Sequence, residues 1–407
     1  MRILELNKYF YLKGGAERYL FELTELLERH GHTIIPFAVD DVRNYPTPWA
    51  SYFVKDIPTE KVTLNWRGIK TAFRIIYSRE TRERSAALIK ASKPQIAHVQ
   101  NIYHQLTTSV LDSIREADLP AVMTIHDYRL LSPNYSLYHR GRICEQGIKH
   151  PLLCSAHGCL KNSVFATLAA GAETVFTRAT RVYPSSIQKF LVPSKFVLGL
   201  FERSGWKMDK FQYLPHFIEA KKYRPNFKSG EAVVYFGRLS HEKGLETLLA
   251  VAKKLPKVKF QIAGSGPLEN RLRSIARQWE LNNVEFLGWL EGEELWEVVR
   301  NALLVVAPSE WYEIFGLTVL EAMALGKAVI ASDIGAYPEL IEHEVSGLLA
   351  KPGDIESWVK AIESVMAQPE VLEEMGRRGR QKVVEDFSAE RHYHDLMEVY
   401  KRAMTGG

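Results

Sequence analysis

The sequence has few cysteines and no long apolar run, and both absences narrow the class of protein. Only 3 of its 407 residues are cysteine, which does not suit a disulfide-stapled secreted fold and predicts a reducing compartment, the cytoplasm. No apolar stretch reaches the length of about 18 residues that a membrane-spanning helix needs. The first residues, M-R-I-L-E-L-N, have the pattern of a buried strand, so we do not expect a signal peptide there.

Two binding motifs are also missing, and the charge is uneven. No G-x-G-x-x-G follows a predicted strand, so a nicotinamide cofactor is not indicated, and no basic groove-binding motif points to nucleic acid. Residues 1–205 carry 27 Lys and Arg against 18 Asp and Glu, whereas 206–407 carry 26 against 30. The basic half suits an anionic acceptor or peripheral contact with the inner face of an anionic membrane, or it is an unremarkable excess.

Short apolar runs alternate with amphipathic helical patterns along the chain, which predicts parallel sheets with right-handed crossovers. We therefore expect an α/β fold with two doubly wound domains. The predicted strands are 2–7, 33–39, 96–99, 121–125 and 181–185 in the first half, and 233–236, 258–262, 284–287, 303–306 and 328–331 in the second. A long helix is predicted at 66–91, whose basic residues lie on a membrane or, as we prefer, on a solvated face.

The stretch 307–325, A-P-S-E-W-Y-E-I-F-G-L-T-V-L-E-A-M-A-L, carries the strongest functional signal. A buried strand leads through a short polar turn into a helix that should begin near 314–316, and the free N–H groups of such a helix start suit a phosphate. Glu313 and Glu321 are eight residues apart, which predicts that both lie on roughly one face. N–H groups that bind a diphosphate, with a carboxylate on each side for sugar hydroxyls, would describe a nucleotide-sugar site. The simpler alternative is that the two glutamates are surface carboxylates on an ordinary helix.

Other strand ends of the second half carry polar or glycine-rich residues. Arg238 and Lys243 follow the first of these strands, and two cations with helix N–H groups can neutralise a diphosphate without a metal. Gly264 and Gly266 follow the second strand, where glycine allows a base or ribose to approach the backbone.

Two features of the first half point to the same kind of ligand. Gly14 and Gly15 join the first strand to a helix, where they either admit a ligand or only make a tight turn. His126 follows the strand at 121–125, at the edge where α/β folds place ligand contacts, although a lone histidine is more often structural.

Taken together, these motifs resemble the retaining GT-B glycosyltransferases, in particular glycosyltransferase family four. The resemblance rests on two glutamates separated by seven residues and followed by A-M-A, on G-R-x-x-x-x-K-G, and on a segment at 332–339 similar to S-x-x-G-x-x-E. It implies two Rossmann-like domains facing a central cleft. The implied divisions are an acceptor-side domain at 1–205, a linker at 206–230, a donor-binding domain at 231–386, and a C-terminal helix at 387–407 that returns to the first domain.

The resemblance also implies roles for particular residues. Asp127 and Tyr128 would face the acceptor. The segment Pro215-His216-Phe217-Ile218 departs from the family's Pro-Asn-Gly-Ile-Asp type, so no role is assigned to His216. The residues implied to act in catalysis are Glu313, His126, Arg238 and Lys243, and those implied to bind the donor are Gly14, Gly15, Arg238, Lys243, Gly264, Gly266, Trp289, Leu290, Glu313, Ile314, Phe315, Gly316, Leu317 and Glu321.

The function that follows is a retaining, metal-independent transfer of a sugar from a nucleoside-diphosphate sugar to a glycan, glycolipid or lipid-linked acceptor. A UDP-sugar is favoured over a GDP-sugar as donor, and no cofactor is required. Two other functions remain open: a nucleotide-sugar epimerase of the same architecture and a non-catalytic nucleotide-sugar binding protein.

All three cysteines, Cys144, Cys154 and Cys159, fall within sixteen residues. In the group resembled, this region tends to carry a C-x-x-C pair followed by two more cysteines, a zinc-like pattern, whereas this chain has Gly147 in place of the second. The alternatives are a structural metal site, with His150 or His157 as a fourth ligand, and buried thiols without a metal. We expect no catalytic metal.

Overall fold

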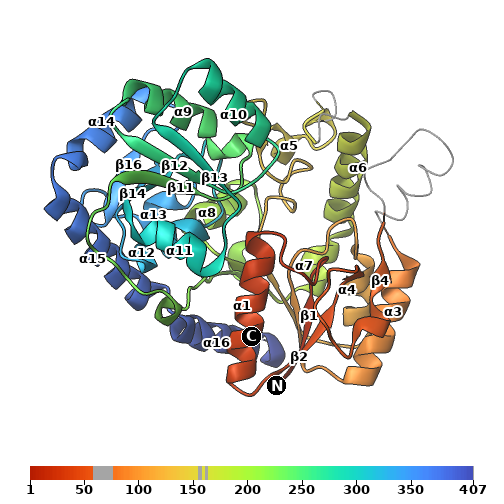
Figure 1. The fold of residues 1–407 in the computed structure, drawn as a ribbon. Coiled ribbons are helices and arrows are strands. Elements are labelled where there is room, and N and C mark those ends of the chain that lie inside the picture. Colours follow the sequence, from red (N-terminus) through yellow and green to blue (C-terminus); the bar gives the residue numbers. More distant parts are fainter. Residues whose placement is uncertain (58–76, 155–157, 161–163, 407) are drawn as a thin grey trace.

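The computed structural model describes residues 1–57, 77–154, 158–160 and 164–406, which form two α/β domains that face each other (Figure 1). Each domain is built on a six-stranded sheet whose strands all run parallel. Among the described residues, no helix is both long and apolar enough to cross a membrane. The predicted fold class is confirmed.

The first sheet has the strand order β10-β9-β6-β5-β1-β2. Along β1, Leu4 packs with the helices of one face, whereas its neighbour Ile3 packs with those of the other. Helices cover both faces, which explains why the strands read as continuous apolar runs. The strands are β1 (Arg2–Leu6), β2 (Thr33–Phe37), β5 (Ile96–Val99), β6 (Ala121–Thr124), β9 (Lys189–Val192) and β10 (Phe211–Tyr213); the main helices are α1 (Gly15–Arg29), α3 (Arg79–Ser92), α4 (Ser109–Glu116), α6 (Val164–Thr180), α7 (Val182–Ser186) and α8 (Lys195–Arg203).

The strand prediction at 181–185 is wrong, because these residues form α7. Pro184 lies in the first turn of that helix, where a backbone N–H has no intrahelical acceptor and its loss costs little. The apolar residues that follow form β9, and β10 then joins the same sheet from within the segment 206–230.

The helix predicted at 66–91 falls partly on residues 58–76, which lie outside the described residues. Its described part begins only at Arg79, because Ser78 has an extended backbone and accepts a hydrogen bond from the N–H of Thr81. Ser78 is therefore a helix N-cap, so a single continuous helix is wrong. The described arginines of this helix are paired, including Arg79 with Glu83, which fits the predicted solvated face.

The second sheet has the order β13-β12-β11-β14-β15-β16, and its first five strands in sequence are the predicted ones. The short strand β16 was not predicted. The elements are β11 (Ala232–Phe236), β12 (Lys259–Ala263), β13 (Val284–Gly288), β14 (Ala302–Ala307), β15 (Val329–Ser332) and β16 (Gly347–Ala350), with helices α9 (Leu245–Lys254), α10 (Glu269–Gln278), α11 (Gly292–Arg300), α12 (Leu317–Ala324), α13 (Tyr337–Leu340), α14 (Ile355–Met366) and α15 (Pro369–Asp386).

The last helix, α16 (Ala389–Thr405), returns to the first domain and lies beside α1, as the resemblance implies (Figure 1). Its fully buried Tyr400 forms a hydrogen bond of 2.7 Å with Nδ1 of His98 on β5. On the next turns, His392 bonds the Tyr19 hydroxyl at 3.0 Å and the Pro215 carbonyl at 2.8 Å. The helix is thus fixed by buried polar contacts as well as by apolar packing.

Four histidines lie within or beside these contacts: His98, His126, His216 and His392. Burial is the main reason why the pKa values of His98 and His126 fall to about 3 and that of His392 to about 4. His216 shifts in the same direction for the same reason. All four are therefore neutral in the folded protein near pH 7.

These histidines predict that the protein loses stability in acid. The unfolded chain takes up protons near pH 6.5, above the pKa of the folded state, so stability is full above pH 6.5 and is lost as the pH falls towards 4. Three carboxyls oppose this, because burial raises the pKa of Glu5 to about 8 and also raises the pKa values of Glu22 and Asp127, so the folded state takes up protons there more readily than the unfolded chain. The four histidines outnumber these carboxyls. We expect the free energy of unfolding in urea to fall between pH 7 and pH 5. His392→Asn should reduce that slope by up to about 1.4 kcal/mol per pH unit.

The matched control is His343→Asn, because the His343 side chain is 51% exposed and lies outside the buried histidine group. An unchanged slope in His392→Asn, or an equal reduction in the control, would contradict the assignment.

Candidate active site

The connection between β14 and α12 spans residues 308–316 and forms the centre of the candidate site. Gly316 is the N-cap of α12 and has a φ of +119°, a backbone conformation that favours glycine. A Cβ on this residue would lie 2.6 Å from the ring of Tyr337, so the space is also closed to a side chain. Among the described residues, no acceptor takes the N–H groups of Phe315, Gly316 or Leu317. The predicted helix start is present, and the binding of an anion to it stays a prediction.

Glu313 is buried and held by three donors from different parts of the second domain. Its Oε1 accepts hydrogen bonds from Lys243 Nζ at 2.6 Å, from the Tyr337 hydroxyl at 3.1 Å and from the Ser309 hydroxyl. Burial raises the pKa of this carboxyl, but Lys243 and the hydrogen bonds outweigh burial, so the pKa lies below its usual value. Glu313 is therefore an ionised carboxylate that is held in one orientation through Oε1.

Glu321 does not share a helix face with Glu313, so that part of the prediction is wrong. The helix begins only at Leu317, and Glu313 lies before it in the loop. Glu321 lies one turn into α12 and forms an ion pair of 2.5 Å with Arg18 on α1. Arg18 also donates a hydrogen bond to the Tyr223 hydroxyl at 2.7 Å. The two carboxylates therefore face different cations, and one of these cations comes from the first domain.

The loop after β11 brings its cations to the start of α12. The position of a Cβ on Gly237 would be 4.0 Å from the methyl carbon of Thr318, in the first turn of that helix. Tyr235 donates a hydrogen bond to the carbonyl of Arg238 at 2.8 Å and fixes the turn. Arg238 is exposed and forms no ion pair with any residue that the structure describes. It is available to an incoming anion, whereas Lys243 is already paired.

Gly264 and Gly266 are required by the packing of two loops. A Cβ on Gly264 would lie 1.9 Å from the carbonyl oxygen of Gly237, and one on Gly266 would lie 2.4 Å from that of Leu239. These two glycines therefore let the loop after β12 pack directly against the loop after β11 that carries Arg238 and Lys243. The packing requires glycine at both positions whether or not a ligand also approaches them.

Trp289 and Leu290 follow β13 at the far end of the same sheet edge. The Trp289 side chain is 62% exposed and its indole donates to Glu291 at 3.3 Å, whereas Leu290 packs against the domain core. Because parallel strands end at one edge, these residues lie in line with Arg238 and Glu313. The edge offers an exposed aromatic ring at one end and an ionised carboxylate nearer the other.

Gly14 and Gly15 stand at the start of α1, in the first domain. A Cβ on Gly15 would meet no atom within 4 Å, and one on Gly14 only a Glu17 oxygen at 3.8 Å. Neither glycine has a left-handed φ, so a tight turn does not explain them. Arg18, one turn later, contacts Glu321, which brings this helix start close to α12.

His126 lies at the end of β6, and Nε2 of its ring pairs with Gln100 Oε1 at 2.6 Å. The ring stacks on His216 with centroids 5.3 Å apart, and His216 in turn meets the edge of Phe315 at 5.1 Å. His126 is therefore joined to the start of α12 through His216. The linker histidine, to which the sequence assigned no role, packs between the two.

The two residues expected to face an acceptor differ in exposure. Asp127 is half-buried and accepts a hydrogen bond from the Arg129 N–H, and burial raises its pKa. Tyr128 is fully buried and its hydroxyl donates to the carbonyl of Tyr312 in the second domain at 2.9 Å. In this structure Tyr128 is an interdomain contact with no open side.

Further contacts between the domains converge on the loop before α12 and on the segment after β15. Ser194 donates a hydrogen bond to the carbonyl of Ile314 at 2.8 Å. The carboxylate of Glu339 accepts from the N–H groups of Lys195 and Phe196, at 2.8 and 2.7 Å, and so caps α8 in the other domain. Together with Arg18, these side chains hold the domains in register.

Sequence reasoning missed several residues that complete the site. Arg18 has a signal in hindsight, because it occupies the first turn of the helix that follows Gly14-Gly15. Ser309, Tyr337 and Tyr223 have none, since each comes from a different element and only the fold brings it to a carboxylate.

Two Rossmann-like domains that face each other, with polar strand ends between them, define the GT-B class of fold. The sequence profile described as "Glycosyltransferase Family 4" matches residues 13–222, and the one described as "Glycosyl transferases group 1" matches residues 217–382. The chain belongs to glycosyltransferase family 4.

The relatives agree with this assignment. An uncharacterised glycosyltransferase of Methanocaldococcus jannaschii is 33% identical over 176 residues, which are 42% of this chain and 45% of that protein. The matches to the first four curated relatives span 35% to 45% of their lengths.

Solved structures resemble the whole chain. Sucrose-phosphate synthase from Thermosynechococcus elongatus aligns over 100% of both chains, with a TM-score of 0.74 and 21% identity. HepE from Anabaena, in complex with UDP and glucose, covers 98% of this chain and 99% of its own, with a TM-score of 0.66 and 17% identity. At these identities the likeness establishes the fold.

The closed space at Gly316 predicts that this position does not tolerate a side chain. Gly316→Ala should lower the free energy of unfolding by about 2 kcal/mol or more, because alanine would be strained at this φ and would overlap the Tyr337 ring. Gly199→Ala in α8 is the control, since a Cβ on Gly199 would have no neighbour closer than 3.4 Å and alanine favours a helix. Urea unfolding should separate the two variants, and equal stability would refute the packing argument.

Proposed function

We propose that the chain is a retaining glycosyltransferase that moves a sugar from a UDP-sugar to a carbohydrate or lipid-linked acceptor without a metal ion. The observation that carries the proposal is the convergence of Arg238, Lys243 and the free N–H groups of residues 315–317 on one sheet edge beside Glu313. Family membership supports glycosyl transfer as the reaction.

The leaving diphosphate would be held by charge that is already in place. Arg238 has no ion-pair partner among the described side chains, and it lies beside the first turn of α12. Lys243 is close enough to share its charge between Glu313 and a phosphate oxygen. Negative charge develops on the leaving phosphate as the glycosidic bond breaks, so donors fixed before the reaction lower its barrier.

Glu313 and His126 would hold the donor sugar from two sides. Three donors occupy Oε1 of Glu313, so Oε2 is the atom proposed to accept from the 3- and 4-hydroxyls. His126 is neutral, and because Nε2 pairs with Gln100, Nδ1 is the ring atom left for a sugar hydroxyl. The acceptor hydroxyl would attack from the same face as the leaving group and pass its proton to the leaving oxygen, which needs no separate base.

Glu321 would accept hydrogen bonds from the ribose hydroxyls. Its ion pair with Arg18 lies where α1 meets α12, so a bound ribose would share the carboxylate with a residue of the first domain. Gly14 and Gly15, with no atoms packed over Gly15, would then approach the phosphates. The proposal of a uracil base draws support from HepE, which is a structural neighbour solved with UDP and glucose.

Removal of the cation or of the ribose carboxylate should abolish transfer. We expect Lys243→Ala and Glu321→Gln each to lower kcat/KM by at least about 100-fold, because each removes a charge aimed at the donor. A panel of UDP- and GDP-sugars, read first by thermal shift and then by turnover, identifies the donor. The anomeric configuration of the product, read by NMR, tests retention.

Lys259→Ala is the matched control, because Lys259 is an exposed lysine paired only with Glu231 at 2.5 Å. Near wild-type turnover in both Lys243→Ala and Glu321→Gln would contradict the proposed donor site. Incubation with the donor alone separates the alternatives, since an epimerase converts the sugar, a transferase gives at most slow hydrolysis, and a binding protein gives neither.

We propose a lipid-linked acceptor at the inner face of the cytoplasmic membrane, on the strength of an apolar face on α6. Val164, Leu168 and Val175 lie on one side of this helix and are 51%, 46% and 41% exposed. Such a stripe on a surface helix suits an interface with lipid. The basic first half of the chain would add attraction to anionic headgroups.

Membrane association predicts sedimentation with vesicles that contain anionic lipid. The double variant Leu168→Ser with Val175→Ser should reduce the bound fraction several-fold, because it removes apolar area from the contact. Val384→Ser on α15 serves as control, since Val384 is 48% exposed in the other domain. Equal binding of the double variant and the wild type would contradict this part of the proposal.

A further inference from the structure

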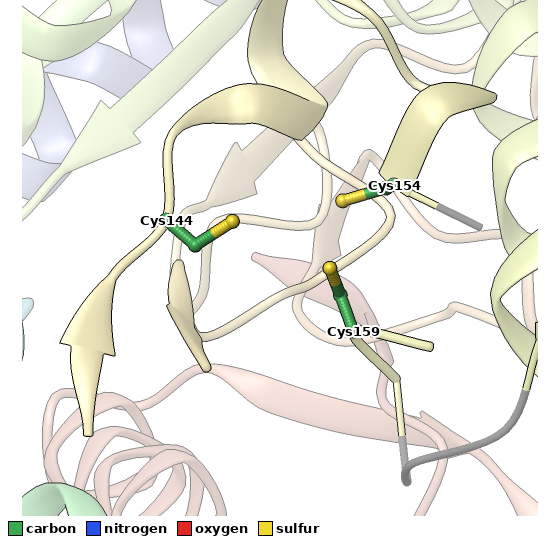
Figure 2. Close-up of side chains that lie close together, drawn as sticks. All are labelled: Cys144, Cys154 and Cys159. Carbon is green, nitrogen blue, oxygen red and sulfur yellow. The ribbon is translucent and has the colours of Figure 1, made fainter. Parts of the chain in front are cut away.

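The three cysteines of the chain converge on one point. Their sulfur atoms all lie within 4.8 Å of one another, although the residues come from three separate turns. Figure 2 shows Cys144 at the end of a strand, Cys154 on a helical turn and Cys159 on the following loop, each with its sulfur directed towards the other two. Cys154 and Cys159 are buried and Cys144 is partly exposed. The three cysteine sulfurs of the protein are thus gathered at one largely buried point, and Cys144 alone of the three is partly exposed.

The segment that carries these cysteines has little regular structure to hold it. Between β6 and α6 its described elements are the two-residue strands β7 (Tyr138–His139) and β8 (Arg142–Ile143) and the four-residue helix α5 (Gln146–Lys149). Long segments of this kind in compact domains are uncommon unless something fixes them. Arg178 on α6 fixes two points, because it donates hydrogen bonds to the carbonyls of Leu131 and Ile148. The turns that bear the cysteines need a further constraint.

The spacing of the sulfurs suits one small metal ion. A tetrahedral ion with metal–sulfur bonds of about 2.3 Å places its sulfur ligands about 3.8 Å apart, so small side-chain adjustments would bring the observed arrangement onto a metal. A disulfide needs sulfurs about 2 Å apart and can use only two of three cysteines. A [4Fe–4S] cluster attaches each thiolate to a different iron, so its thiolate sulfurs lie further apart than those of this trio, and a [2Fe–2S] cluster likewise separates the thiolates of its two irons. Soft thiolates grouped around one point are typical ligands of zinc.

We propose that Cys144, Cys154 and Cys159 bind one Zn²⁺ ion as a structural site. Each thiol gives its proton to solvent and becomes a thiolate ligand, and the zinc keeps its oxidation state throughout. The fourth position is taken by water or a small anion on the side where Cys144 is exposed. The packing around the trio is tight, because a Cβ on Gly147 would lie 2.3 Å from the Ser132 hydroxyl and 3.0 Å from the sulfur of Cys154. Glycine at this position lets the turn close over the ion.

The ion would act on the donor site only through the position of the segment it fixes. Near the cysteines, the Tyr138 hydroxyl reaches Oε2 of Glu310 in the second domain at 3.4 Å, and Cys144 bonds the Leu137 carbonyl through its N–H at 2.7 Å. Glu310 lies in the loop between β14 and α12 and accepts a hydrogen bond from Thr247. A zinc-bound segment therefore supports the contact between the first domain and this loop. The site is independent of which sugar, base or acceptor the protein uses.

The test measures metal rather than activity. The full chain, purified without chelator, should contain about one zinc per molecule by elemental analysis. After removal of zinc, titration with Co²⁺ alone should give the intense visible bands and the sulfur charge-transfer absorption of a tetrahedral cobalt thiolate. Cys159→Ser should lose the bound zinc and weaken Co²⁺ binding by more than about 100-fold. His150→Ala, which removes an exposed imidazole next to the site and leaves every thiol, should keep both.

Three results would overturn the proposal that the three cysteines bind zinc. These are a wild-type protein that neither retains zinc nor gives the cobalt–thiolate spectrum, a Cys159→Ser variant that keeps its metal, and a His150→Ala variant that loses it. If the serine variant does not fold, the wild-type titration still decides the question, because it needs no variant. Removal of zinc by a chelator should also lower the melting temperature of the wild type, since the ion binds only the folded chain, and an unchanged melting temperature would contradict a structural role.

Discussion

The buried negative charge of Glu313 is the constraint on which the packing of loops in the second domain depends. An ionised carboxylate removed from water is tolerated only when it is paired and hydrogen-bonded. Lys243 from the loop after β11 and Tyr337 from α13 meet this need at a single oxygen, together with Ser309 from the loop that carries Glu313 itself. Three elements that are distant in sequence are thereby held at one point. The same point is where α12 presents its free N–H groups, so the requirement that stabilises the loop also shapes the site.

The loop that carries Glu313 is held from the first domain as well. The side chains of Tyr128 and Ser194 donate hydrogen bonds to its Tyr312 and Ile314 carbonyls, and Tyr138 reaches Glu310. The first two contacts use backbone carbonyls of the loop, which no strand or helix satisfies, so these carbonyls can be buried at a domain boundary. The loop therefore belongs to both domains. Any shift of one domain against the other must move the residues that are proposed to hold the donor.

Repeating patterns made much of the fold predictable from the sequence. Each strand of the second domain from β11 to β15 is a short, mainly apolar run bounded by polar turns, and this pattern predicts a buried strand. The segment at 181–185 failed because a valine–tyrosine pair looks like a strand, whereas Pro184 suits a first helical turn. In the site, Lys243 and Glu313 could be predicted because each follows a strand end. Arg18 with Glu321, and Tyr337 with Glu313, could not, since such pairs depend on how elements pack and no local pattern encodes packing.

The ion pairs of the site explain how an anionic ligand could bind without a large excess of positive charge. Lys243 is matched by Glu313 and Arg18 by Glu321, so each buried carboxylate is neutralised and the site can form without ligand. Arg238 is not matched within the described chain, and its charge adds to the positive end of the α12 dipole. A diphosphate would first contact the unpaired Arg238 and would then contact Lys243. The ion pair with Glu313 holds the Lys243 side chain in place for this contact. A carboxylate partner would therefore prepare the proposed phosphate site, because it fixes the position of a flexible cation before the ligand arrives.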